Sequence, residues 1–469
     1  MKRPMLSILP LLCAVAATRI LGAMVLPVYD DAFITFRYAK NLVETGSFVY
    51  NAGEWVLGTT APLFGLISAL FYVLHLPMPA SIVVLNLLID LVLAYVIFRF
   101  VSKEFSYNAA VFAVLFFAVS PILVRISVGG MEANLFVLVI MSSLLLYRSD
   151  KKFAAIVLAS LSYFIRPEGA LLAMFLVGSE VLAKRYVSAI KLACISAITV
   201  APGLILLTLS YGTFVPQSVA AKAGQHLPIV EVFKRLVLPE AAAIAFVVLS
   251  LFAIVLMYRS KKFIATYAAF VLIYFGAYLV MRPWVWSWYA MPIQTALVIG
   301  AGIGTAVILE RFVVFSRPVW QRAASLAGVV CVMGVWGAIF VMKGSSGITS
   351  NIYGSLASTS PSLVRTSVLA TDIGAIGYFS NAQVYDGLGL VTPDAAQHAN
   401  LDSMILAAKP DAVFLNTSLE TKKLMDKEYF SSVYTSARRY GPSGDSTLPA
   451  DPATYVDGWQ QDYLLFVKR

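Results

Sequence analysis

Charged side chains are scarce in this chain of 469 residues. Asp, Glu, Lys and Arg together make up 13% of the positions, whereas hydrophobic residues make up 59%. A soluble domain cannot hide such a composition beneath a polar surface. Apolar runs recur from the N-terminus to about Phe340. Each run has about 20 residues, enough to cross a hydrocarbon core of roughly 30 Å. The composition therefore excludes a soluble enzyme and predicts a polytopic α-helical membrane protein.

Cysteine and histidine are also scarce, with three residues of each type. The cysteines Cys13, Cys194 and Cys331 all fall inside predicted spans, where a small apolar packing role is expected instead of a disulfide or a metal site. The histidines share no metal-ligand spacing. We predict no cofactor, and a requirement for a divalent metal ion stays open.

Basic residues outnumber acidic ones, and the formal net charge is +10. Nucleic-acid binding is not indicated, because the basic clusters lie in short connections between apolar runs, where positive charge favours the cytoplasmic side. About eleven spans place every cluster on that side, with the N-terminus in the cytoplasm and the C-terminus outside. The predicted spans are residues 7–28, 80–98, 108–125, 132–147, 153–165, 168–183, 187–210, 236–257, 263–281, 289–309 and 323–342.

Four apolar runs need separate treatment. The first is interpreted as a membrane anchor, since it lacks the small-residue cleavage pattern of a signal peptide. Residues 59–76 cannot be a further span without moving most basic clusters outside, so we expect a juxtamembrane or re-entrant segment. The short runs 153–165 and 168–183 predict a tight hairpin that turns at residues 166–169.

The chain changes character after residue 342, where apolar runs shorten and polar residues return. We therefore predict a transmembrane domain over residues 1–342 and an extracytoplasmic domain over residues 343–469. Its segments alternate between strand and helix patterns, which predicts a small α/β fold. The expected strands are residues 367–371, 382–385, 412–415 and 463–467, with a helical run near 395–408.

The glycine-rich segment 372–377 lies in this domain. Its glycines lack the spacing of a phosphate-binding loop, and the domain is predicted to lie outside the cytoplasm. Packing on the outer loops, or holding an acceptor, is the expected role.

The first outer loop, residues 29–58, carries two adjacent carboxylates where the first span meets the membrane surface. These are Asp30 and Asp31. At helical spacing Phe33 and Arg37 share a face with Asp30, which predicts a surface-lying helix with an acidic start. One interpretation is that an aspartate only caps this helix. The other is that it takes part in chemistry.

More ionisable residues are predicted on the same outer side, and any one of them can be a structural ion pair or a side chain that reaches the interface. Their common side favours a shared site. They are Glu132, Arg166, Glu168, Lys222 and Arg282.

Carboxylates and cations at a membrane surface suit the transfer of a sugar from a lipid phosphate to a hydroxyl group. A carboxylate can accept the hydroxyl proton. Basic side chains can bind the phosphate and stabilise the charge that it gains. Direct displacement inverts the anomeric configuration. Trp284 and Trp288 can stack on a sugar or the lipid, or form an interfacial aromatic belt.

The first outer loop resembles a known family. Its segment 30–39 reads Asp-Asp-Ala-Phe-Ile-Thr-Phe-Arg-Tyr-Ala, and segments 48–54 and 60–63 follow it. This pattern resembles the polytopic glycosyltransferases of the GT-C superfamily that use polyprenyl-phosphate sugars, and it is most similar to bacterial terminal arabinofuranosyltransferases. Further similar segments are residues 130–132, 166–169, 372–378 and 386–390.

The resemblance implies a catalytic base at Asp30, with Asp31 beside it, and juxtamembrane helices after the first outer loop. Combined with the chemistry above, the hypothesis assigns the donor phosphate to Arg37, Lys222 and Arg282. It assigns substrate contacts to Glu132, Arg166, Glu168, Trp284 and Trp288. The outer loop that precedes Lys222 departs from the family pattern, which leaves the sugar and the acceptor open.

The sequence thus predicts an inverting glycosyltransferase of the inner (plasma) membrane. It would transfer a monosaccharide, arabinofuranose by the resemblance, from a polyprenyl phosphate to a cell-envelope glycan, lipid or protein acceptor, with the bilayer as its setting and no nucleic acid. One alternative is a transporter or flippase of polyprenyl-linked lipids, which should show repeats or charges within spans, whereas the strongest charges here collect in loops. The other is a scaffold in which the acidic pair only caps a helix.

Overall fold

The computed structural model of this chain is mainly helical and divides into two compact units, each of which we describe by itself. The first unit comprises residues 1–24, 82–203 and 225–344, and the second comprises 25–81, 204–224 and 345–469. The structure describes residues 4–222, 226–240, 243–250, 263–309, 327–328, 330–331, 334–335, 348–393, 400–416, 419–440 and 463–469.

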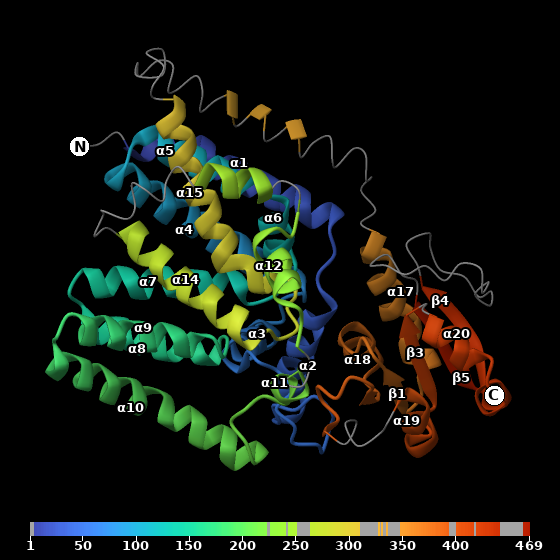
Figure 1. Cartoon of the computed structure of the whole chain (residues 1–469). Coiled ribbons are helices and arrows are strands. Elements are labelled where there is room, and N and C mark those ends of the chain that lie inside the picture. Colours follow the sequence, from blue (N-terminus) through green and yellow to red (C-terminus); the bar gives the residue numbers. More distant parts are fainter. Residues whose placement is uncertain are drawn as a thin grey trace. The chain divides into compact units, whose positions relative to one another are not determined.

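Helices make up the described part of the first unit, and α10 continues into the second unit (Figure 1). The elements are α1 (Pro4–Val25), α4 (Ala80–Glu104), α5 (Tyr107–Val119), α6 (Pro121–Val128), α7 (Ala133–Arg148), α8 (Lys152–Leu161), η1 (Ser162–Phe164), α9 (Gly169–Leu182), α10 (Tyr186–Tyr211), α12 (Ile229–Val237), α14 (Phe263–Met281), η2 (Ser287–Ala290) and α15 (Met291–Leu309).

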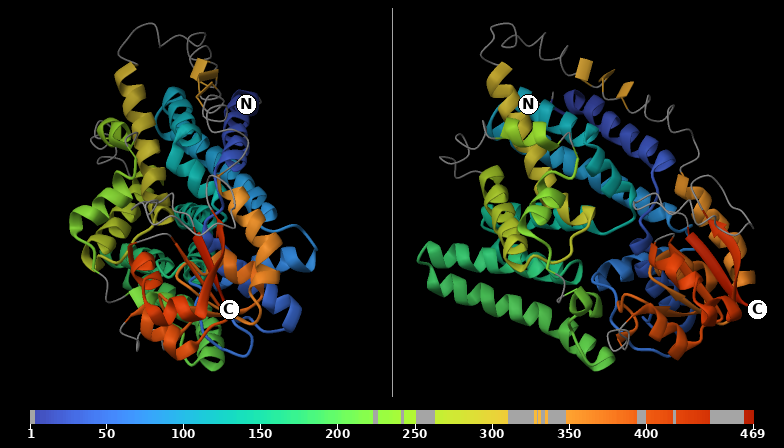
Figure 2. Two further views of the ribbon diagram at one scale, coloured as in Figure 1. Left: turned by 90° about the vertical axis from the view of Figure 1, so that its right-hand side faces the viewer. Right: turned by 45° about the vertical axis from the view of Figure 1, so that its right-hand side comes forward.

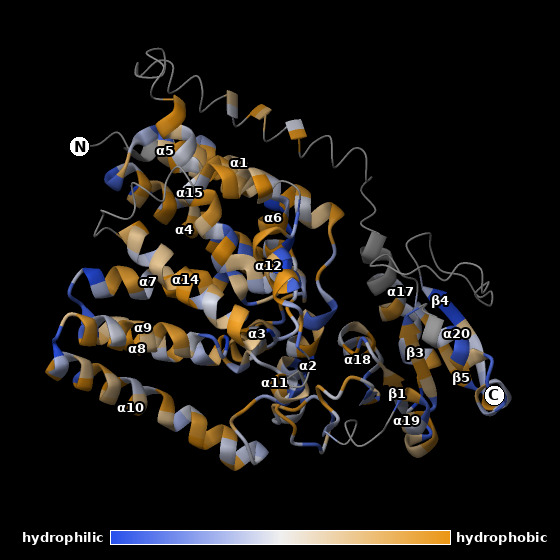
Figure 3. Ribbon diagram, in the orientation of Figure 1, coloured by the Kyte–Doolittle hydropathy of each residue, from blue (hydrophilic) through white to orange (hydrophobic). Residues whose placement is uncertain are grey.

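Five of the described helical segments are long and apolar enough to cross a membrane: α1, α4, α10, α14 and η2 joined to α15. Helices α5 and α6 make a sixth candidate only if this pair, bent by 59°, counts as one span. Hydrophobic residues cover these helices, and polar residues gather in the turn after α7 (Figure 3). The protein is therefore a multi-pass membrane protein, as its composition predicts.

The remaining predicted spans differ from full-length helices. Helix α7 has 16 residues, α8 has 10 and α9 has 14, which is short for a complete crossing. These three helices lie side by side (Figure 1), and the chain turns between α8 and α9 at residues 165–168. The predicted spans 236–257 and 323–342 lie partly outside the described residues.

The bend between α5 and α6 follows from Pro121, which has no N–H and so leaves the carbonyl of Phe117 without its helical partner. The guanidinium of Arg19, on α1, donates to that carbonyl at 3.2 Å and to the carbonyl of Ala118 at 3.0 Å. Arg19 also pairs with Asp90 of α4 at 2.7 Å. The cation thus joins three helices at the bend.

The Arg19–Asp90 pair corrects the expectation that the strongest charges lie in loops. The side chains are 1% and 0% exposed, and both lie within helices that qualify as spans. Asn134 donates to the second carboxylate oxygen of Asp90. A charge inside a span is tolerated here because each partner satisfies the other and the neighbouring backbone.

The described part of the second unit contains the C-terminal sheet region and, besides the end of α10, four helices that lie outside that region. The helices outside the sheet region are α2 (Asp30–Thr45), α3 (Pro62–Val73), α11 (Gln217–Lys222) and α17 (Ile348–Leu363). The sheet region contains β1 (Ser367–Ala370), α18 (Gly374–Ser380), β2 (Gln383–Asp386), α19 (Leu401–Ala408), β3 (Ala412–Asn416), α20 (Leu419–Met425), α21 (Glu428–Val433), β4 (Tyr434–Tyr440) and β5 (Tyr463–Lys468).

Helix α3 covers part of the segment for which a juxtamembrane position was expected. Its 12 residues span about 18 Å, too short to cross a bilayer. Phe64 and Ser68 are buried on one face, while Leu66 and Leu70 are more than half exposed on the other. This two-faced character is typical of a helix that lies along a surface.

The five strands that the structure describes form one sheet in the order β2-β1-β3-β5-β4. Figure 2 shows these orange and red strands from two further sides. β1 pairs in parallel with β2 and β3, and β5 pairs antiparallel with β3 and β4. A parallel pair needs a crossover, and α18 is the helix in the connection from β1 to β2. Leu369, Val413 and Phe466 belong to the buried core beside the sheet.

The predicted α/β fold is therefore present, with all four expected strands in place and α19 within the expected helical run. Strand β4 was missed, because its sequence Tyr-Thr-Ser-Ala-Arg-Arg-Tyr lacks the apolar alternation of a half-buried strand and its middle residues are only partly covered. Residues 395–399 of the expected helical run lie outside the described residues.

Candidate functional site

The acidic pair begins α2, as the spacing in the first outer loop predicts. Asp30 and Asp31 occupy the first turn, where the helix dipole favours negative charge. Tyr29 takes the N-cap position and makes no side-chain cap hydrogen bond. Neither aspartate is therefore the N-cap of its own helix.

The carboxylate of Asp30 instead meets the start of α18, 344 residues further along the chain. Its Oδ2 accepts the N–H of Gly374 at 2.7 Å, and its Oδ1 accepts the N–H of Ala375 at 2.8 Å. A side chain at position 374 would overlap the backbone carbonyl of Asp30, so only glycine permits this approach. The glycine-rich segment thus packs on the first outer loop and presents its amides to a carboxylate.

A third carboxylate, Asp372, lies two residues before the start of α18, and its charge acts on Asp30. Burial, together with the charges of Asp372 and Asp31, raises the pKa of Asp30 to about 7 against the opposing effect of the two N–H groups. Burial and the charge of Asp31 raise the pKa of Asp372 to about 6. Asp30 keeps part of its surface exposed. It is a carboxylate poised to exchange a proton near neutral pH.

Arg37 was expected to bind a donor phosphate, and the structure argues against this assignment. Its side chain is buried, and its N–H groups donate to the carbonyls of Tyr50 at 2.7 Å, Gly377 at 2.8 Å and Ala382 at 2.6 Å. A further bond of 3.3 Å reaches Asn51. Arg37 therefore holds α18 and the strand that follows it against the first outer loop.

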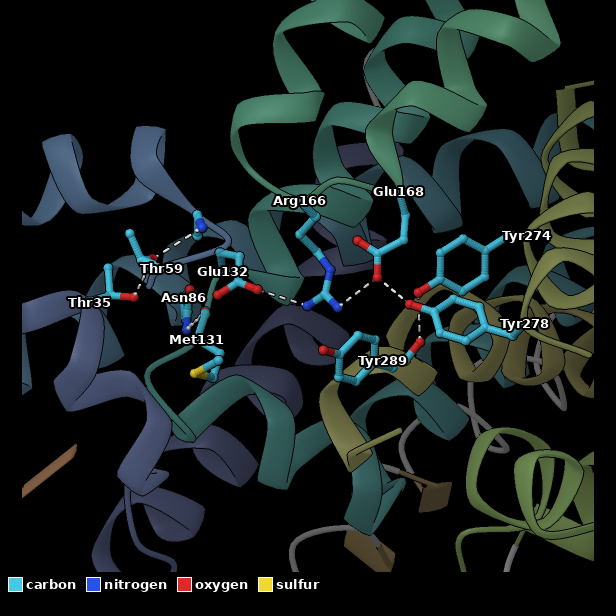
Figure 4. Close-up of polar contacts among 11 residues, drawn as sticks. Thr35, Thr59, Asn86, Met131, Glu132, Arg166, Glu168, Tyr274, Tyr278 and Tyr289 are labelled. Atoms are coloured by element: carbon cyan, nitrogen blue, oxygen red, sulfur yellow. Dashed lines mark hydrogen bonds and ion pairs between the residues drawn. The ribbon is translucent and has the colours of Figure 1, made fainter. Parts of the chain in front are cut away.

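Three predicted substrate contacts come together in the first unit. Arg166 lies between two carboxylates, with Nη1 2.8 Å from Glu132 and Nη2 3.2 Å from Glu168 (Figure 4). The hydroxyl of Tyr278 donates to Glu168, and the ring of Tyr289 lies 4.5 Å from the guanidinium carbon. Glu132 and Arg166 are 2% and 3% exposed.

This cluster retains hydrogen-bonding capacity. Within the described part of the chain, Arg166 Nε and Glu168 Oε2 are buried and have no hydrogen-bond partner. One is a donor and the other is an acceptor.

The tryptophan-rich loop before α15 holds the predicted aromatic contacts. The rings of Trp284, Trp286 and Trp288 follow one another with centroids 5.9 Å apart at each step. Arg235 of α12 lies 4.6 Å above Trp284 and donates to the carbonyl of Val285 at 3.3 Å. The sequence analysis missed Arg235. Its contact with Trp284 depends on the packing of α12 against this loop, which the sequence does not show.

The two remaining predicted phosphate ligands are Arg282 and Lys222. Arg282 is exposed at the end of α14 with a φ of 49°, and its carbonyl accepts the N–H of Leu227 at 2.9 Å. The side chain of Lys222 lies outside the described residues. Among the described residues, no three His, Cys, Asp or Glu side chains converge as a metal site.

The C-terminal part of the chain, residues 357–462, matches a family model described as a domain of unknown function (DUF8728). No curated protein matches the chain in sequence.

Solved structures resemble nearly the whole chain. One is ArnT from Cupriavidus metallidurans bound to undecaprenyl phosphate, with a TM-score of 0.62, 12% identity, and coverage of 98% of this chain and 97% of ArnT. Another is the Archaeoglobus fulgidus oligosaccharyltransferase in complex with Zn and sulfate, with a TM-score of 0.57, 12% identity, and coverage of 92% and 72%. The same archaeal enzyme with an inhibitory peptide and a dolichol-phosphate gives a TM-score of 0.52 at 9% identity, and coverage of 94% and 74%.

At these identities the likeness shows the fold. The chain has the GT-C fold that the resemblance of its first outer loop implied.

Proposed function

We propose that this protein is a glycosyltransferase that moves one monosaccharide from a polyprenyl-phosphate donor to a hydroxyl group of an acceptor on the outer side of the membrane. The observation that carries the proposal is the Asp30 carboxylate, which is partly exposed, is held by two backbone amides and has a pKa near 7. The likeness to ArnT, which was solved with undecaprenyl phosphate, supports a lipid-phosphate donor.

In the proposed step, the acceptor oxygen attacks the anomeric carbon while its proton passes to the Asp30 carboxylate. The bond from the anomeric carbon to the phosphate oxygen breaks, and polyprenyl phosphate leaves with the bonding electron pair. One such displacement inverts the anomeric configuration. Lys222 and Arg282 are the proposed cations for the growing phosphate charge, and Arg37 is dropped because backbone carbonyls already engage it.

The proposed substrate contacts are the Glu132–Arg166–Glu168 cluster and the tryptophan-rich loop. Sugars present adjacent hydroxyl groups, each both a donor and an acceptor, which match the unpartnered Arg166 Nε and Glu168 Oε2 in the described part of the chain. Trp284, which is less buried than Trp288, is the ring proposed to stack on a sugar or an isoprene unit.

The finer proposal concerns the sugar and its place in the cell. The resemblance of the first outer loop favours an arabinofuranosyl donor and a glycan, lipid or protein acceptor of the cell envelope. The topology argued from basic clusters favours the inner (plasma) membrane, with the N-terminus in the cytoplasm and Asp30 outside.

Transfer by the purified protein in lipid nanodiscs tests the proposal, with a panel of polyprenyl-phosphate pentoses and hexoses and an envelope glycan extract as acceptor. We expect one donor to be consumed by the wild-type protein and not by Asp30→Asn, with both proteins equally monodisperse. Transfer from no donor in the panel would reject the function. Equal transfer by both proteins would reject Asp30 as the base.

One observation favours the alternative of a lipid transporter, namely the buried charges of Arg19 and Asp90 within spans. Their partners are the carbonyls at the α5–α6 bend and Asn134, so a structural role accounts for them. Movement of a fluorescent polyprenyl phosphate across proteoliposomes, absent from protein-free vesicles and lost in Asp90→Asn, would favour transport.

A further inference from the structure

Helix α18 begins with amides that its own sequence cannot cap. The first N–H groups of any helix lack partners within the helix. The N-cap residue of α18 is Ile373, whose side chain has no acceptor. Asp30 supplies acceptors to two of these groups, one oxygen to Gly374 and the other to Ala375.

Other contacts hold α18 in this place independently of Asp30. The hydroxyl of Tyr50 donates to the carbonyl of Ile373 at 2.6 Å, and Arg37 donates to the carbonyl of Gly377 at 2.8 Å. A side chain at Gly377 would overlap the hydroxyl of Tyr50 and the guanidinium of Arg37. The positions of the amides at the start of α18 therefore do not depend on Asp30. The Asp30 carboxylate binds to amides that other contacts already hold in place.

We propose that residues 372–375 of the C-terminal domain are part of the catalytic site. The amides of Gly374 and Ala375 orient the Asp30 carboxylate, and Asp372, two residues before the first of these amides, is a positioning residue for it. The catalytic consequence rests on the proposed function, whereas the contact itself does not.

The geometry leaves Asp30 able to act. Each carboxylate oxygen has two acceptor sites, and each amide occupies one of them, so a hydroxyl group can still approach. Within the described ranges, the charged and titratable groups that act on Asp30 are Asp31 on its own helix, Asp372 before α18 and Tyr50 of the first outer loop, with Arg37 acting on Tyr50. Two of these are carboxylates, and both favour protonation of Asp30.

The first test is the pH dependence of transfer. Replacing Asp372 by Asn removes one negative charge beside Asp30 without changing the size of the side chain. We expect the acid limb of the kcat/KM profile to move to lower pH by about one unit, with the plateau retained. A purely structural Asp372 would change the plateau or the stability and leave the limb in place, and that result would overturn the proposal.

The matched control is Asp402→Asn, which also removes a carboxylate from the C-terminal domain. Asp402 pairs with Lys427 and accepts a hydrogen bond from Tyr429. Its profile should coincide with that of the wild-type protein. A shift equal to that of Asp372→Asn would mean that net charge, and not position, is responsible.

A second test needs no activity and so separates failure of this inference from failure of the proposed function. Hydrogen exchange of the peptide 372–378 should be at least about tenfold faster in Asp30→Ala than in the wild-type protein. A peptide over β3 reports whether the sheet stays folded. If the β3 peptide also exchanges faster in Asp30→Ala, the variant is unfolded in this region. Asp30→Asn, which keeps one acceptor oxygen, then provides the same comparison. Unchanged exchange at 372–378 in a folded variant would overturn the contact.

Discussion

The two units use carboxylates in opposite ways. In the first unit, Glu132 and Glu168 flank the guanidinium of Arg166, so each negative charge has a cation beside it. In the second unit, Asp30 is close to the charges of Asp31 and Asp372, and the partners that its carboxylate has among the described residues are two backbone N–H groups. Carboxylates paired with a cation stay ionised and fix the positions of the side chains around them. Carboxylates that are close to one another retain a proton to higher pH.

The comparison also shows how each cluster is built. Glu132, Arg166 and Glu168 lie at the ends of neighbouring short helices, within 36 residues of one another along the chain. The Asp30 cluster joins segments 344 residues apart. The first arrangement depends on local hairpin packing, and the second depends on closure of the whole unit.

The largest effect is expected from Asp30→Asn, which removes the proposed base but keeps a side chain of the same size. Transfer should fall about 10²- to 10⁴-fold in kcat, the usual contribution of a general base. Single-turnover assays with the polyprenyl-phosphate sugar measure this step. If Glu168→Gln loses more activity at the chemical step than Asp30→Asn, the roles of the two regions are reversed.

The next effect concerns stability and is expected from Arg166→Met. This change leaves Glu132 and Glu168 without their common cation, and breaking a buried pair in this way costs about 3–5 kcal/mol. A detergent thermal-denaturation series should show a much lower midpoint. Arg148→Met, at the exposed end of α7, is the control and should change the midpoint little. Equal stability of the two variants would mean that the cluster is not structural.

A smaller effect is expected from Arg282→Ala, because this side chain is exposed. Loss of one charged contact to a phosphate should raise the KM for the donor about tenfold and leave the KM for the acceptor unchanged. Initial rates with each substrate varied in turn give both constants. Equal changes in the two would remove Arg282 from the donor site.

The most gradual effect is the pH dependence of the wild-type protein. The proposed base must be ionised, and the pKa of Asp30 is raised to about 7, so activity should be lost as the pH falls through that value. Below it, kcat/KM should drop about tenfold per unit. Full activity at pH 5 would show that Asp30 is not poised as the structure indicates.

Sequence patterns predicted a large part of this protein because those patterns are local. The lengths of apolar runs predicted α1, α4, α10 and α14, and the shift in composition near residue 343 predicted the α/β region. Strand β4 escaped prediction because its polar residues give no apolar alternation.

The candidate site was predicted less completely. The outer loop pointed to Asp30 and Asp31, yet Arg37 was assigned to a phosphate because a cation near carboxylates suggests a ligand. Asp372 directly follows a predicted strand, a position at the carboxyl edge of a parallel sheet that could have marked it. Nothing local connected Asp372 with Asp30.

By itself the sequence determined the membrane setting, the places of most helices and strands, and the acidic start of the first outer loop. Hydropathy and helix or strand periodicity depend on residues within one or two turns of each other, so the local sequence is enough to predict them. Only the tertiary structure decided which partners the charges meet. Arg37 is engaged by backbone carbonyls, Arg19 by the α5–α6 bend and Asp30 by α18, because segments far apart in the chain become neighbours only when the units close.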